Sequence, residues 1–148
     1  MTIRLATIAA ATALTACSGE QAGPPASQQD TDFAARSADL PQEMSVETPE
    51  PNARITTPLQ LSGSVPGTWY FEGSFPIRLQ SADGETLAQS VANSTEDWMT
   101  EEPVAFEASL DFSVSAPTEA TLVLSEDDPS GRGNVQEARL PVVLFPRN

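Results

Sequence analysis

Large apolar residues alternate with polar ones along most of the chain after residue 51. The clearest run is Val104, Phe106, Ala108, Leu110 and Phe112, in which every second position is apolar. This period of two is typical of β-strands that bury one face. The pattern predicts seven strands, near residues 53–56, 58–64, 71–81, 86–92, 104–114, 119–126 and 137–145.

Turn sequences separate the predicted strands. Gly, Pro and Asp gather at residues 65–67, 83–84, 116–118 and 128–131, and these residue types favour turns. No sustained helical apolar period occurs after residue 51. Several short strands joined by turns are typical of an immunoglobulin-like β-sandwich. We therefore expect an all-β fold, a sandwich of about seven strands, over residues 51–148.

The first 16 residues have the layout of a signal peptide. One basic residue, Arg4, precedes the uncharged and mostly apolar residues 5–14, and small residues follow. The tetrad of residues 14–17, Leu-Thr-Ala-Cys, resembles a bacterial lipobox, whose cysteine receives a diacylglycerol before the peptide is cut. We expect lipid on Cys17 and a membrane anchor there. A plain signal peptide followed by an unmodified cysteine is the alternative.

Residues 17–50 are rich in Gln, Ser, Ala, Pro and acidic side chains, with few large apolar residues. Such a composition offers too little apolar surface to offset the entropy of ordering. We expect a disordered acidic tether over this range. The predicted organisation is therefore a signal peptide (1–16), a lipidated cysteine with its tether (17–50) and a folded domain (51–148).

The residue inventory argues against catalysis. All seven basic residues are arginine, histidine is absent, and Cys17 is the only cysteine. A Ser-His or Cys-His pair, a lysine Schiff base and a histidine metal site are thereby excluded. A pair of carboxylates remains chemically able to cleave glycosides, but no spacing singles one out. We expect no enzyme and no cofactor. The net charge of −14 also makes nucleic acid an unsuitable partner.

Three segments carry a resemblance to a known family. Their sequences are WYFEGSFP at 69–76, WMTEE at 98–102 and DDPSG at 127–131. In this order they resemble the marker segments of the Gmad2 family, the immunoglobulin-like domain named from bacterial spore germination proteins. The resemblance covers residues 53–145. The chain departs from the expected pattern at Glu126 and Asp128, where Lys and Asn are expected, and at Pro103.

The resemblance implies a β-sandwich on an exported or lipid-anchored bacterial protein, without catalytic residues to transfer. Ser18 after the cysteine, in place of aspartate, resembles the signal that permits transfer to the outer membrane. We therefore expect an envelope lipoprotein, facing the periplasm if the bacterium has two membranes. Its domain is expected to serve interaction, scaffolding or accessory roles toward another envelope protein. Binding of polysaccharide or Ca²⁺ is the alternative.

Two groups of side chains are candidate sites. Trp69, Tyr70, Phe71 and Trp98 are expected either to fill the core or to present an aromatic interaction platform. The acidic residues include Glu126, Asp127 and Asp128, which are weak candidates for Ca²⁺ ligands because calcium prefers six to eight oxygens. A solvated acidic loop is the other interpretation of these carboxylates.

Overall fold

The computed structural model describes residues 33–147. The predicted signal peptide, Cys17 and the predicted tether up to residue 32 lie outside the described residues. Within 33–147, no helix has the length and apolarity that crossing a bilayer requires. The described residues form eight strands and one short 3-10 helix: β1 (Ser45–Thr48), β2 (Arg54–Ile55), β3 (Leu59–Pro66), η1 (Gly67–Trp69), β4 (Ser74–Ser81), β5 (Thr86–Ser94), β6 (Pro103–Leu110), β7 (Thr118–Ser125) and β8 (Glu137–Leu144).

The prediction of an all-β fold is confirmed. Each of the seven predicted strands has a counterpart among β2 to β8. Two differ in extent by three residues or more, β4 and β6. β4 begins at Ser74, three residues late, because Glu72 and Gly73 adopt positive φ angles of 52° and 78°. β6 ends at Leu110, and the N–H of Phe112 donates instead to the Thr57 hydroxyl, at 3.1 Å.

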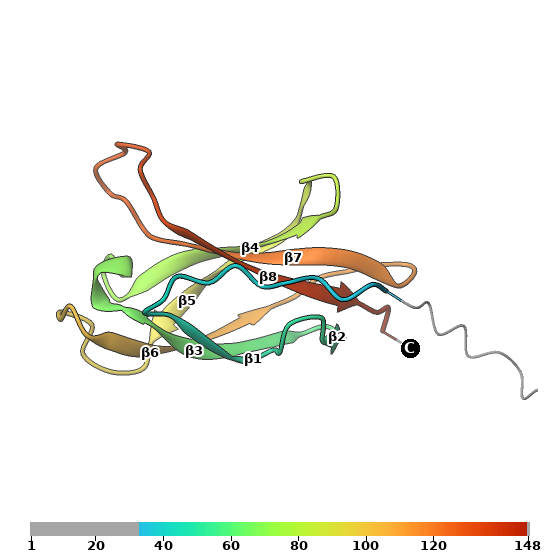
Figure 1. Cartoon of the computed structure of the whole chain (residues 1–148), viewed down its shortest axis with the longest axis horizontal. Coiled ribbons are helices and arrows are strands. Elements are labelled where there is room, and N and C mark those ends of the chain that lie inside the picture. Colours follow the sequence, from blue (N-terminus) through green and yellow to red (C-terminus); the bar gives the residue numbers. More distant parts are fainter. Residues whose placement is uncertain (1–32, 148) are drawn as a thin grey trace, which may run out of the picture. The chain divides into compact units, whose positions relative to one another are not determined.

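The strands form one sheet that curls into two layers. Their order is β1-β3-β6-β5-β4-β7-β8-β2, and only the β2–β8 pair is parallel. β5 makes the turn between the layers, since it pairs with β4 along most of its length but with β6 only at Asn93 and Ser94. Figure 1 shows β4, β7 and β8 facing β1, β3 and β6. The result is the predicted sandwich.

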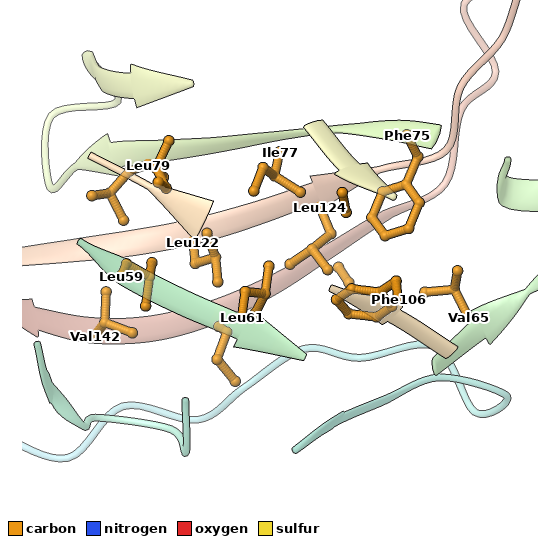
Figure 2. Packing of buried hydrophobic residues seen from close by; sticks show 14 of the residues in the cluster. Leu59, Leu61, Val65, Phe75, Ile77, Leu79, Phe106, Leu122, Leu124 and Val142 are labelled. Atoms are coloured by element: carbon orange, nitrogen blue, oxygen red, sulfur yellow. The ribbon is translucent and has the colours of Figure 1, made fainter. Parts of the chain in front are cut away.

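The core lies between these layers. Figure 2 shows Leu59, Leu61 and Val65 of β3 pointing toward the side chains of the opposite layer, among them Ile77 and Leu124. All five are at most 2% exposed. Complete burial of one such side chain stabilises a fold by about 1.5–3 kcal/mol. With a single cysteine in the chain, this packing stabilises the domain without an internal disulfide.

The folded part begins earlier than predicted. Residues 33–50 were expected to be disordered, yet β1 pairs with β3 within this range, and Met44 is only 8% exposed. The boundary predicted at residue 51 is therefore wrong. β1 has only one large apolar residue, Val46, so it lacks the alternation that marks the other strands. β1 is held at the sheet edge by its backbone hydrogen bonds with β3. Such bonds leave no pattern in the side chains.

Residues 33–44 run along β8 in the opposite direction to the strand. Asp39 and Arg139 exchange two backbone hydrogen bonds of 2.8 Å. Arg36 lies farther along β8, where its Nη2 donates to the carbonyls of Ala120 and Val142, both at 2.9 Å. We call residues 33–44 the strap. The strap is fixed by polar contacts with the backbone of β7 and β8.

Replacement of Arg36 by alanine is expected to lower the free energy of unfolding by about 1–3 kcal/mol, because two carbonyls lose a charged donor. Urea titration followed by tryptophan fluorescence measures the change. The matched control is Arg147→Ala, at an exposed position, for which a change within about 0.5 kcal/mol is expected. Equal free energies of unfolding for the two variants would show that the contacts of Arg36 do not stabilise the domain.

Candidate interaction site

The three segments singled out in the sequence meet at one end of the sandwich. The Asp127 N–H donates to the Trp69 carbonyl at 3.0 Å, and the Gly67 N–H donates to the Glu102 carbonyl, also at 3.0 Å. In Figure 1 these segments lie at the left, whereas the described chain begins and ends at the right. We call the left end, formed by residues 67–74, 95–102 and 126–136, the distal end, and the opposite end the base.

Trp69 and Tyr70 belong to the core. Both are almost fully buried, and both place their rings edge-on to Phe75, with centroid distances of 6.1 and 5.2 Å. Phe75 in turn meets Phe106 of the opposite layer at 5.2 Å. Trp69 and Tyr70 therefore fill the core, and neither is part of an exposed aromatic platform.

Phe71 is placed differently, at the surface. It exchanges two backbone hydrogen bonds with Ser74, at 2.9 and 3.1 Å, around a turn formed by Glu72 and Gly73. Both central residues have positive φ, as in the tight turns that join antiparallel strands. The turn directs Phe71 outward, and 42% of its surface is exposed.

Trp98 lies against this turn and is half-buried. A Cβ atom added to Gly73 would lie 3.3 Å from both Cδ1 and Nε1 of the Trp98 indole. Glycine is thus favoured at position 73 by its φ angle and by the close approach of the ring. Trp98 also packs against the edge of the core, so it connects the core with the surface.

Met99 was not among the predicted site residues. It follows Trp98 and is 77% exposed, more than any other large apolar residue described. Its N–H donates to the Asp97 carboxylate at 3.0 Å, and the next N–H, of Thr100, donates to the Trp98 carbonyl at 2.8 Å. These turns hold Met99 outward. The sequence does contain one indication of this site: Trp98 and Met99 form an apolar pair inside an otherwise polar loop.

The loop 95–102 closes tightly onto η1. At Gly67 an added Cβ would lie 2.0 Å from the Thr100 carbonyl oxygen and 2.5 Å from that of Trp98. Backbone atoms cannot yield to such an approach, so residue 67 must be glycine for this loop to dock. The loop is therefore held by its own turns and by contact with η1.

The Tyr70 hydroxyl forms hydrogen bonds with the backbone of β6. It donates to the carbonyl of Val104 at 2.9 Å and also approaches that of Ala105 at 3.3 Å. Burial, reinforced by the nearby negative charge of Glu96, raises the pKa of Tyr70 well above its ordinary value of about 10. Tyr70 remains protonated and serves as a hydrogen-bond donor between η1 and β6.

The carboxylates of Glu126 and Asp128 order the loop that contains them. Glu126 accepts from the Gln136 N–H at 3.2 Å. Asp128 accepts from the hydroxyl and N–H of Ser130 and from the N–H of Gly133, and its hydrogen bond with the Ser130 hydroxyl lowers the pKa of Asp128 most. Across residues 33–147, no group of three or more acidic, histidine or cysteine side chains is arranged to hold a metal ion.

Exposed carboxylates dominate the rest of the distal end. Five acidic residues in the segments 67–74 and 95–102 are exposed: Glu72, Glu96, Asp97, Glu101 and Glu102. The same segments contain no basic residue. These two segments therefore combine exposed apolar groups with a negative field, whereas the segment 126–136 also carries one exposed basic residue, Arg132.

Comparison with known families agrees with this fold. Residues 43–133 match the family model Gmad2, the immunoglobulin-like domain of bacterial spore germination. The chain belongs to this family. The match begins at residue 43 and so includes β1, in agreement with the early start of the fold. No curated protein and no solved structure matches the chain. Membership in the Gmad2 family indicates a non-catalytic module.

Alkaline titration of the Gmad2 domain tests the environment of Tyr70, the only tyrosine of the chain. Because its pKa is higher in the folded state than in the unfolded state, its contribution to stability is complete below about pH 10 and is lost as the pH rises further. We expect the phenolate absorbance to appear only together with loss of the β-sheet circular dichroism signal.

The matched variant is Tyr70→Phe, which removes the hydroxyl and keeps the ring. It should abolish the phenolate signal and lower the free energy of unfolding by about 1 kcal/mol. Phenolate absorbance that rises near pH 10 while the circular dichroism remains native would contradict the burial of this hydroxyl.

Proposed function

We propose that this protein is a non-enzymatic envelope lipoprotein whose Gmad2 domain serves as an interaction or accessory module for another envelope protein. Lipid on Cys17 attaches it to the membrane, and the outer membrane is its location in a bacterium with two membranes. The lipobox-like tetrad at residues 14–17 supports the anchor. Membership in the Gmad2 family supports the module.

The observation that carries this proposal is the direction in which the chain enters the domain. The described chain starts at the base, beside the end of β8, and reaches the distal end along the strap. β3, with eight residues, spans roughly 26 Å at about 3.3 Å per residue. The chain that would connect the domain to a lipid on Cys17 therefore enters at the base, and the distal end lies at the opposite end of the domain.

The chemistry of the distal end favours binding over catalysis. Tyr70 is held protonated by burial, and Asp128 is occupied by hydrogen bonds within its own loop. Phe71 and Met99, in contrast, are exposed and take no part in the core. Surface apolar groups held in fixed positions are typical of protein interfaces.

The anchor is tested by Cys17→Ala in the native bacterium, with Ser18→Ala as the matched control. Two or more acyl chains hold a protein stably on a membrane. We expect the protein with Ser18→Ala to remain in the membrane fraction and to incorporate labelled fatty acid, and the protein with Cys17→Ala to lose both properties. Membrane retention and labelling of the Cys17→Ala protein would contradict the lipoprotein assignment.

The interaction role is tested by photo-crosslinking in the intact envelope. A photoreactive amino acid replaces Met99 at the distal end or, as the control, Ser115, an exposed residue in the loop before β7. We expect a discrete protein adduct from position 99 and none from position 115. Adducts from position 115 alone, or from neither position, would overturn the proposal that the distal end binds a partner.

A further inference from the structure

Three apolar residues lie on adjoining loops at the distal end. Phe71 is 42% exposed and Met99 is 77% exposed. Trp98 precedes Met99 in the sequence and lies against the turn that begins at Phe71. We call these three residues the apolar patch. Single exposed apolar residues are ordinary on protein surfaces, whereas three on adjoining loops form a contact surface.

The charged residues close to the apolar patch in sequence are acidic. Phe71 precedes Glu72, and the pair Trp98 and Met99 follows Asp97. Glu101 and Glu102 lie two and three residues after Met99, and both are exposed. A surface of this kind repels acidic glycans, anionic lipid headgroups, nucleic acids and a second copy of the same acidic chain.

A hollow at the distal end is lined by acidic and apolar residues, among them Trp69 and Glu101, which lie two residues from Phe71 and Met99 in the sequence. It has a volume of about 460 Å³, and its lining includes Glu43 at the end of the strap, Glu101 in the loop 95–102, and Pro66 and Trp69 near η1. Carboxylates from two separate segments thus line one hollow, and no arginine is among its lining residues. A long cationic side chain fits this combination of space and charge.

We propose that the distal end binds a cationic, partly apolar segment of the partner protein. An apolar side chain of that segment packs on Phe71 and Met99, and a neighbouring lysine or arginine enters the hollow between Glu43 and Glu101. This inference rests on the proposed function and adds the chemistry of the partner. Charge complementarity favours a basic protein segment over acidic glycans, anionic lipids, nucleic acids and a second copy of this chain.

The binding experiment uses the full-length lipidated protein in neutral detergent and three synthetic peptides of equal length. One alternates Lys with Leu, the second alternates Glu with Leu, and the third alternates Lys with Ser. Emission from Trp98 reports contact, because Trp69, the only other tryptophan, is buried. The protein with Trp98→Phe, and empty micelles, supply the background.

We expect the Lys/Leu peptide to shift the emission of Trp98 to shorter wavelength, and the other two peptides to bind at least about tenfold more weakly. Raising the salt concentration to 1 M, where the screening length is about 3 Å, should weaken the binding of the Lys/Leu peptide. Equal binding of the Glu/Leu peptide, or binding that salt does not change, would overturn the inference.

Matched variants separate the distal end from the rest of the surface. Met99→Ser is compared with Val91→Ser, another exposed apolar residue, and Glu101→Gln with Glu107→Gln, another exposed glutamate. Only the distal member of each pair should weaken binding, by about tenfold for Met99→Ser. Equal effects within each pair would overturn the proposal. If photo-crosslinking at position 99 still captured a partner, the interaction role would stand and only the predicted chemistry would fail.

Discussion

The edge-on contacts of Phe75 hold the layers and the distal end in one arrangement. Phe75 of β4 meets Phe106 of β6 across the core, and it also meets both rings of the segment that follows β3. Aromatic pairs in this geometry contribute about 0.5–1.5 kcal/mol beyond their buried area. Trp69 and Tyr70 are fixed in this way, and Phe71 next to them is directed out of the core by the turn at Glu72 and Gly73.

The strands were predictable because their burial is one-sided. Leu59 and Leu61 of β3, or Ile77 and Leu79 of β4, face the core at every second position, which produces the period of two in the sequence. The fold class and seven of the eight described strands follow from that pattern. β1 does not, since a short edge strand with little apolar surface is stabilised by its backbone hydrogen bonds.

The candidate site was predictable in part, for a related reason. The aromatic cluster at 69–71 and Trp98 were identified from composition, but their division into core and surface depends on the tight turn at Glu72 and Gly73. Met99 was missed because an apolar pair, Trp98 and Met99, in an otherwise polar loop has no period. The strap was missed because its fixed points are Arg36 and Asp39, which composition identifies only as polar.

The direction of the strap has a mechanical consequence. Under the proposed function, tension on the chain before the strap and a partner held at the distal end would act on opposite ends of the domain, along the axis of β8. The hydrogen bonds of Arg36 and Asp39 with β7 and β8 lie side by side along that axis. Tension would therefore load these bonds in shear, so that they share the force instead of opening one after another. Contacts loaded in this way would resist traction between the start of the strap and the distal end.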